Sequence, residues 1–356
     1  MASTWEKKTF TRENGEKVQM HFPIIVSASR STDIPAFYSD WFFHRLKVGY
    51  SAWTNPFNGE KSFIAYEDTR FIVFWSKNPR PLLSHLPELK DRNIGCYIQY
   101  SLNDYEKEKL EVGVRPLQER IDTFKRLVDE LGLGGVVWRF DPLMLTEDIH
   151  IDDLLSKIER IGDQLQGYTE KLVFSYADIE LYRKVKKNLE KNNIPYREWD
   201  ESNMLEFARL LSSLNKKWGY ELATCAEKID LENLGIQHNR CIDDKLIIRR
   251  GFNDRKLMNF LNVTLQPVDA VDLFGNPLPV HEDAILLPNE TYAIRGKKRD
   301  SGQRKLCGCI ASKDIGEYNT CIHLCEYCYA NTSKESAKRN YSTHKANPFS
   351  ETITGR

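Results

Sequence analysis

Three cysteines lie close together near the end of the chain, and their spacing suits a metal centre. Cys321, Cys325 and Cys328 follow a C-x3-C-x2-C pattern, with the aromatic Tyr327 directly before the third. Thiolates are soft ligands that select iron–sulfur clusters, zinc or copper(I). A [4Fe–4S] cluster usually takes four cysteines, so three leave one iron open unless the chain supplies another ligand. The pattern therefore predicts an iron–sulfur cluster able to bind a small molecule.

The alternative for this stretch is a zinc site. Zinc favours C-x2-C pairs completed by further cysteines or histidines. Cys325 and Cys328 form one such pair, and His323 could join them. The three-cysteine pattern is more specific than a single C-x2-C pair, which favours iron–sulfur chemistry.

Four further cysteines equal the number of ligands in a closed four-thiolate site. They are Cys225, Cys241, Cys307 and Cys309. Such a site serves either zinc or a second iron–sulfur cluster, and unbound thiols are the remaining alternative. The eighth cysteine, Cys96, lies in an apolar strand-like run and is expected to be a small buried hydrophobic residue.

The elements that must position these cysteines alternate between strand and helix. Apolar, β-prone runs occupy residues 24–29, 50–54, 71–75, 95–101, 136–140, 172–176 and 220–224. Amphipathic helical patterns separate most of them, and the clearest has Pro116 at its first position and Gly132 at its C-terminal cap. This alternation predicts an α/β fold with a mostly parallel sheet, as a partial or complete (β/α) barrel.

Polar residues follow each expected strand, and the carboxyl ends of barrel strands are where active sites are built. Arg30, Lys77, Arg139 and Asp141 are therefore candidate catalytic residues, and Asn78 is a candidate ligand-binding residue. The three cations can hold an anionic ligand by charge-assisted hydrogen bonds. Salt bridges within the barrel rim, to Asp33 or Asp141, are the alternative role.

Five segments are expected along the chain. Residues 1–20 form a polar arm, 21–228 the barrel, 229–305 a connecting segment, 306–345 a cysteine-rich segment packed on the barrel, and 346–356 a tail. Within the connecting segment, residues 247–251 are expected to form a strand. We expect the cysteine-rich segment to pack beside residues 24–29, and a circular permutation of the barrel would require this contact.

Composition limits the class of protein. The chain has 356 residues, 51 basic and 51 acidic, so a strongly basic nucleic-acid surface is not indicated, although a local patch remains open. The polar first residues do not resemble a signal peptide, and no apolar run has membrane-helix length. We therefore expect a cytoplasmic protein with no membrane partner, and its eight cysteines favour metal binding over disulfides.

The stretch from Cys321 to Cys328 resembles the cluster motif of the radical S-adenosylmethionine (SAM) superfamily. That resemblance implies a cluster whose free iron chelates SAM and cleaves it to a 5′-deoxyadenosyl radical. It also implies a reductant such as flavodoxin or ferredoxin, and SAM contacts from Tyr327, Arg30, Asn78 and Arg139. Radical SAM barrels carry their cysteine loop after the first strand. Here the loop follows the other strands, so the chain looks like a circular permutation of that barrel.

Two more specific resemblances support this interpretation. Arg120 and the run Trp138 to Leu143 are similar to the spore photoproduct lyase group, which is related to DNA repair photolyases. The whole chain resembles a bacterial family catalogued as domain of unknown function 1848, at residues 29–38, 55–58, 74–79, 138–142, 225–227, 241–243 and 314–321. Leu324 stands where glycine is expected in the cluster motif. The family implies no substrate.

Three functions follow from these patterns. The first is a radical SAM enzyme with an unknown substrate. The second is a non-catalytic iron–sulfur or zinc protein. The third is a zinc-dependent barrel hydrolase, which needs an open site with histidine or carboxylate ligands, whereas the eight histidines show no H-x-H or H-E-x-x-H pattern.

Overall fold

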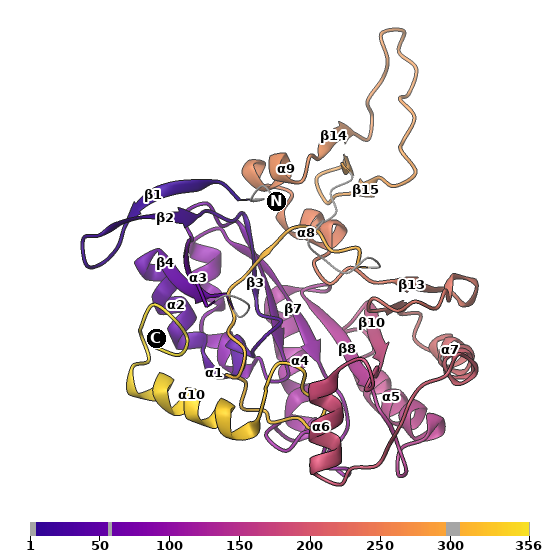
Figure 1. The fold of residues 1–356 in the computed structure, drawn as a ribbon. Helices are drawn as coiled ribbons and strands as arrows, with labels where there is room; N and C mark the ends of the chain where they lie inside the picture. The colour runs from indigo at the N-terminus through magenta and orange to yellow at the C-terminus, as the bar shows by residue number, and fades with distance from the viewer. Residues whose placement is uncertain (1–4, 56–58, 297–306, 356) are drawn as a thin grey trace.

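A computed structural model describes residues 5–55, 59–296 and 307–355 of the chain. Its centre is a parallel sheet of eight strands in the order β13-β12-β10-β8-β7-β6-β3-β17 (Figure 1). The bounds are β3 Ile25–Ala28, β6 Phe71–Ser76, β7 Gly95–Ser101, β8 Val136–Leu143, β10 Lys171–Tyr176, β12 Glu221–Thr224, β13 Ile236–His238 and β17 Lys313–Asp314. This confirms the α/β class, and β13 and β17 stand at the two ends of the order.

Alternate residues of each strand face opposite sides of the sheet, and both sides are buried. On β6, for example, Ile72 and Phe74 belong to one apolar cluster, whereas Phe71 and Val73 belong to another. A parallel sheet covered on both faces needs apolar residues at successive positions. The uninterrupted apolar runs in the sequence are therefore the signature of strands buried on both faces.

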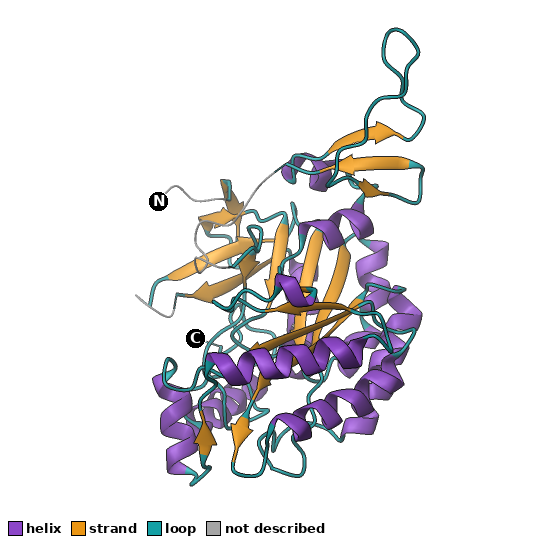
Figure 2. Cartoon of the chain, turned by 90° about the vertical axis from the view of Figure 1, so that its right-hand side faces the viewer, coloured by secondary structure: helices purple, strands orange, loops and turns teal. Residues whose placement is uncertain are grey.

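Most helices cover one face of the sheet (Figure 2). The long ones keep an apolar stripe toward it, and α4 ends where Gly132 adopts a positive φ of 76°. The helices are α1 Ile34–Phe37, α2 Ser39–Val48, η1 Arg80–Ser84, α3 Leu86–Asp91, α4 Leu117–Leu131, α5 Ile151–Leu165, α6 Arg183–Lys191, α7 Glu201–Asn215, η2 Glu232–Leu234 and α10 Lys334–Ala346. Among the described residues, no helix combines the length and apolar character needed to cross a bilayer.

The other face is covered by helices α8 (Asp244–Gly251) and α9 (Arg255–Phe260). The strand expected at residues 247–251 is wrong, because these residues form most of α8. Asp243 caps this helix by accepting hydrogen bonds from the backbone N–H groups of Lys245 (2.9 Å) and Leu246 (3.5 Å). A capping residue followed by a buried pair, here Ile247 and Ile248, favours a helix over a strand.

A separate four-stranded sheet contains β1 Lys7–Thr11, β2 Lys17–His21, β5 Lys61–Ala65 and β4 Tyr50–Thr54, in that order. The expectation that residues 50–54 belong to the main parallel sheet is therefore wrong, because β4 pairs antiparallel with β5. Part of the expected N-terminal arm also has regular structure, since β1 and β2 form a hairpin.

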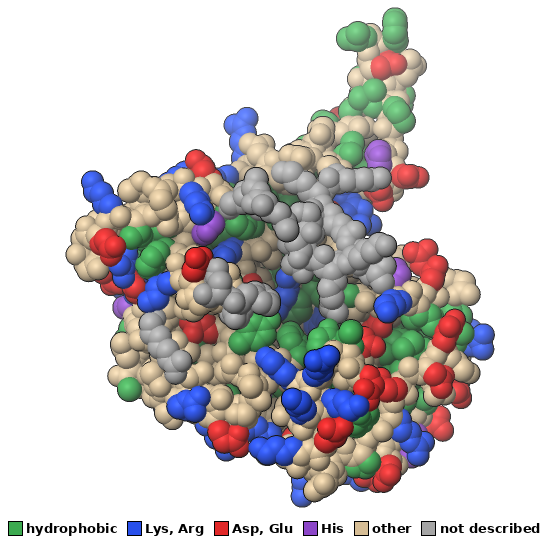
Figure 3. Space-filling view, viewed as in Figure 1, with side chains coloured by type: hydrophobic (Ala, Val, Ile, Leu, Met, Phe, Trp, Pro, Cys, Tyr) green, Lys and Arg blue, Asp and Glu red, His purple; other side chains and the backbone are tan. Residues whose placement is uncertain are grey.

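Residues 264–294 form an extension that projects from the body (Figures 1 and 3). Apart from this extension, β9 Leu145–Thr146 and β11 Tyr196–Arg197 form a short pair of their own. Strands β14 Thr264–Pro267, β15 Ile285–Leu286 and β16 Thr291–Ile294 make the base of the extension. At its tip, Leu273 and Phe274 are 100% and 89% exposed. The expected connecting segment therefore holds α8, α9 and a small sheet, and its residues 297–305 lie outside the described residues.

Candidate functional site

Strand β17 places the three-cysteine loop at the carboxyl end of the sheet. It pairs parallel with β3, with Asp314 opposite Ser27. The Asp314 carboxylate accepts hydrogen bonds from the Ser27 hydroxyl (3.0 Å), the Ser29 hydroxyl (2.8 Å) and the backbone N–H of Arg30 (2.9 Å). The chain leaving β17 therefore enters the cysteine loop at the edge where β3 also ends.

Gly316 permits this close approach. A Cβ atom at this position would lie 1.8 Å from the Ser29 hydroxyl oxygen, so no larger residue fits without displacing the β3 end. The carbonyl of Gly316 accepts a hydrogen bond of 2.9 Å from the Trp53 indole of β4. The smaller sheet thus supports the start of the cysteine loop.

The loop itself is fixed to the ends of β3 and β7 by buried contacts. A ring nitrogen of His323 lies 2.7 Å from the Asp33 carboxylate, and the other lies 3.2 Å from the carbonyl of Gly113. The backbone N–H of Glu326 donates to the carbonyl of Leu110 at 2.9 Å. Both nitrogens of His323 are thus engaged, which argues against the zinc site that would use this histidine.

Leu324, which stands where glycine is expected in the cluster motif, has a glycine-like backbone conformation. This residue has a φ of 55°, in the left-handed region that favours glycine. The cysteine loop therefore takes a glycine-like turn before Cys325 although the residue is leucine. The turn keeps the spacing of Cys321, Cys325 and Cys328 on one short loop.

The three thiols of this loop lie near one another in a region of low solvent access. Burial, together with the neighbouring thiols, raises the pKa of Cys321 and of Cys325, and burial raises the pKa of Cys328. Metal binding would have to remove these protons. Across residues 5–55, 59–296 and 307–355, no three Cys, His, Asp or Glu side chains enclose one point closely enough for a single ion. A four-iron cluster binds each thiolate through a different iron, so its ligands stand further apart, and this donor set fits it.

A buried polar cluster lies beside the cysteine loop and joins two of the predicted residues. The ammonium of Lys77 contacts the Glu111 carboxylate at 2.7 Å and donates to the Tyr327 hydroxyl at 3.0 Å. Tyr327 donates its hydroxyl proton to Glu111. The Asn103 amide donates to both of these partners at 3.1 Å. The loop aromatic is thereby fixed to the ends of β6 and β7.

Electrostatics keep this cluster ionised despite its burial. Burial opposes ionisation of Glu111, but the charges of Lys77 and Arg120 and the hydrogen bonds lower its pKa to about 2. Burial likewise opposes the charge of Lys77, but Glu111 and Cys325 raise its pKa. A fixed cation thus stands next to the Cys325 thiol. Sequence reasoning missed Glu111, because it lies in an irregular segment before α4 with no recognisable motif.

Arg139 and Asp141 form an ion pair on β8. This is the salt bridge expected from the sequence as the alternative to ligand binding by Arg139. The Arg139 guanidinium also contacts the Gln99 amide oxygen at 3.2 Å and the Cys241 sulfur at 3.3 Å. Asn103 joins Asp141 to the polar cluster, because its amide oxygen accepts from the Asp141 backbone N–H at 2.9 Å. Lys77, Arg139 and Asp141 therefore belong to one connected network, through Glu111 and Asn103.

Arg30 and Asn78 have different surroundings. The Arg30 guanidinium lies 5.6 Å from the centre of the Trp75 ring, and one terminal nitrogen is buried with no hydrogen-bond partner. Arg139 lies 5.3 Å from the same ring. Asn78 donates its backbone N–H to the Ser76 hydroxyl at 2.9 Å, a local turn contact. Arg30 therefore keeps an unused donor, whereas this contact of Asn78 is structural.

The second set of cysteines also comes together. The sulfurs of Cys225 and Cys241 lie 3.4 Å apart. Cys309 belongs to the same apolar cluster as Cys241, and Cys307 packs against that cluster. The hydrogen bond from Cys309 lowers the pKa of Cys307 to about 7. In contrast, Cys96 lies in the apolar core, where burial raises its pKa to about 11.

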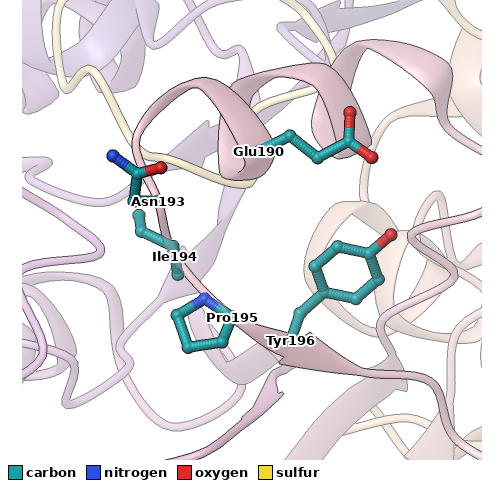
Figure 4. Close-up of a pocket in the computed structure, with 5 residues that line it drawn as sticks. All are labelled: Glu190, Asn193, Ile194, Pro195 and Tyr196. Atoms are coloured by element: carbon teal, nitrogen blue, oxygen red, sulfur yellow. The ribbon is translucent and has the colours of Figure 1, made fainter.

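A surface pocket at the end of α6 lies apart from these groups (Figure 4). Glu190, Asn193, Ile194, Pro195 and Tyr196 line it. None of these residues belongs to the cysteine groups or to the polar cluster, so the chemistry predicted from the sequence lies elsewhere, at the carboxyl edge of the sheet.

Comparison with known proteins gives a family but no characterised relative. Neither the curated proteins nor the solved structures yielded a match to the chain. One family model, described as "Domain of unknown function (DUF1848)", matches residues 25–330, from β3 through both cysteine groups. This range covers most of the 356 residues. The chain therefore belongs to the domain of unknown function 1848 family.

Proposed function

We propose that this protein is a radical SAM enzyme whose open [4Fe–4S] cluster is held by Cys321, Cys325 and Cys328. The observation that carries the proposal is the position of the cysteine loop. It directly follows β17, which pairs parallel with β3, so it begins at the carboxyl edge of the sheet. Active sites of parallel α/β sheets lie at that edge.

Strand order supports a circularly permuted barrel. From β3 to β13, each strand of the main sheet pairs with the next strand of that sheet along the chain. Only β17 is out of sequence, since it is last in the chain but pairs with β3. If the order is read from β17, the cysteine loop follows the first strand, as in radical SAM barrels. The C-terminal segment and α2 are already in contact, because the Trp41 indole donates to the Ser350 carbonyl at 2.8 Å.

When bound, the cluster would supply an electron that cleaves SAM into methionine and a 5′-deoxyadenosyl radical. The chain's residues have separate tasks. Lys77, Tyr327 and Asn103 hold the loop and keep a positive charge beside Cys325. The buried free donor of Arg30 suits the carboxylate of SAM. A flavodoxin or ferredoxin is the class of protein that would supply the electron.

The proposal is tested by SAM cleavage in the Cys325→Ala variant. We expect the anaerobically reconstituted wild type to show a [4Fe–4S]⁺ EPR signal that changes on addition of SAM. With dithionite it should release 5′-deoxyadenosine. Cys325→Ala should reduce that release to background, because two thiolates do not retain the cluster. The measurements are EPR and chromatography of the nucleoside.

Cys96→Ala is the matched control, because it also removes a buried thiol but lies within the apolar core. It should keep both the EPR change and the nucleoside release. Full release by a folded Cys325→Ala variant would refute this site. A wild type that holds iron but never cleaves SAM would leave the non-catalytic function in its place.

A further inference from the structure

Three separate segments bring the second group of cysteines to one place. Cys225 directly follows β12, and Cys241 lies shortly after β13, its parallel neighbour. Cys309 comes from the segment that leads to β17, and the backbone N–H of Ile310 donates to the carbonyl of Ile242 at 3.2 Å. The pairing of β12 with β13 brings Cys225 and Cys241 together. Cys309 comes from the segment before β17, which lies at the opposite end of the strand order.

The four cysteines gather in one buried cluster of side chains. The sulfurs of Cys225 and Cys241 are 3.4 Å apart. Cys241 and Cys309 belong to the same apolar cluster, and Cys225 and Cys307 pack against it. A single buried cysteine packs as a small hydrophobic residue, as Cys96 does, but that role does not require four cysteines in one place.

The surroundings of the sulfurs are those of anionic ligands. The Cys241 sulfur accepts from the Arg139 guanidinium and from the Asn239 amide, each at 3.3 Å. The Cys309 sulfur accepts from the backbone N–H of Ile242 at 3.3 Å. Hydrogen bonds to sulfur and nearby charge are the means by which proteins stabilise and tune thiolate-bound metals.

Charge balance points the same way. Four thiolates around a zinc ion, or around an oxidised [4Fe–4S] cluster, leave two excess negative charges. Arg139 is 2% exposed and already pairs with Asp141, so by itself it offsets little of this charge. Burial opposes the charge of Arg30, but Cys309, Asp314, Cys241 and Cys307 raise its pKa. The Arg30 guanidinium is therefore a cation placed to offset part of the negative charge of the metal-bound site.

We propose that Cys225, Cys241, Cys307 and Cys309 bind a second metal centre through four thiolates. Zinc and a [4Fe–4S] cluster share this ligand chemistry. Sulfurs around one zinc ion are about 3.8 Å apart, and the Cys225–Cys241 separation is close to this. Among the described residues no three such side chains converge closely enough for one ion, so the wider spacing of a cluster fits the four sulfurs better. The site does not depend on the proposed SAM chemistry, and the same experiment separates the two metals.

The test removes the first cysteine site and then asks whether metal remains. The background is the full chain carrying Cys321→Ala, Cys325→Ala and Cys328→Ala, purified without oxygen. We expect it to retain about one zinc per chain, or about four irons with an equal amount of acid-labile sulfide. Adding Cys241→Ser should lower that metal at least tenfold. Adding Cys96→Ala to the same background should leave the metal unchanged.

Thiol labelling keeps the proposal testable if Cys241→Ser does not fold. Cys307 is only half-buried, so it should react with iodoacetamide once the metal is absent. In the triple-alanine background, mass spectrometry should show Cys307 protected before chelation and labelled after it. Equal labelling in the two states, or equal metal with and without Cys241→Ser, overturns the proposal. Because the first site is absent throughout, failure of the SAM function leaves these outcomes unaffected.

Discussion

Glu111 neutralises the cations buried beneath the cysteine loop. It contacts Lys77 at 2.7 Å and lies 3.8 Å from Arg120, whose side chain is 1% exposed. Burying a cation without its counter-charge costs far more free energy than an ion pair on the surface contributes to stability. The structure of the buried polar cluster beside Cys325 therefore depends on Glu111, which belongs to no recognisable sequence motif.

Glu111→Gln is expected to lower the free energy of unfolding by about 3–5 kcal/mol at pH 7, because it leaves Lys77 buried without a counter-charge. The pKa of Glu111 falls from its ordinary 4.5 to about 2 on folding, so its stabilisation is complete above pH 4.5. It is lost as pH falls toward 2. Urea unfolding of the metal-free protein at several pH values should thus show the difference between wild type and variant shrinking over that range.

Glu119→Gln serves as the control for this measurement. Glu119 is 44% exposed and pairs with Arg115 at 3.4 Å on the surface. Its replacement should change the free energy of unfolding by less than about 1 kcal/mol. Equal losses in the two variants would show that Glu111 has no special role.

At the scale of elements, β17 has only two residues but fixes the whole cysteine segment to the sheet. Its pairing with β3 is reinforced by Asp314, which accepts from side chains and from the backbone N–H groups of Arg30 and Gly316 at 2.9 and 3.0 Å. One carboxylate thus replaces the backbone hydrogen bonds that a longer strand would form.

Asp314→Ala should therefore release the C-terminal segment from β3. The loss of a shared acceptor leaves several donors unpaired, at a cost of at least about 2 kcal/mol in the free energy of unfolding. Limited proteolysis should cut the segment after residue 307 faster than in the wild type. Asp148→Ala, at an exposed position, should behave as wild type. An unchanged digestion rate for Asp314→Ala would contradict the role given to this carboxylate.

The sequence predicted elements where local pattern decides them, and missed what depends on distant contacts. The run at residues 172–176 matches β10, because burial on two faces leaves an uninterrupted apolar run. The pattern at residues 151–165 matches α5, because burial of one stripe leaves a clear helical periodicity. Hydrophobic periodicity does not encode whether β4 joins the main parallel sheet or the four-stranded sheet. The sequence did group Cys225, Cys241, Cys307 and Cys309 by their number, but the path of the chain that brings Cys309 near Cys241 has no local pattern. Glu111 lacks any pattern at all.

On the scale of the whole molecule, the projecting extension stands apart from the packed body. Its tip is a turn in which the Asp272 carboxylate accepts from the backbone N–H groups of Phe274 (2.7 Å) and Asn276 (2.9 Å). Leu273 and Phe274 are thereby held outward, at the end of a stretch with other exposed apolar residues (Figure 3). Such surfaces promote association between molecules.

Replacing both tip residues, as Leu273→Ser with Phe274→Ser, should change the free energy of unfolding by less than about 0.5 kcal/mol, since neither is buried. It should also reduce light scattering in concentrated solution. Leu287→Ala, at a residue 3% exposed near the base of the extension, should instead cost about 2–5 kcal/mol. A large loss of stability in the tip variant would show that the tip packs against the body.

The late position of β17 in the chain has a consequence during synthesis on the ribosome. Strands β3 to β13 emerge in the order in which they pair, so most of the sheet can assemble as it is made. The outer edge of β3 keeps its backbone groups unpaired until residues 313–314 appear, after every other strand of that sheet. The three-cysteine loop follows immediately. Nascent chains therefore pass through a stage with an open strand edge, and the three-cysteine loop is made only after the rest of the sheet.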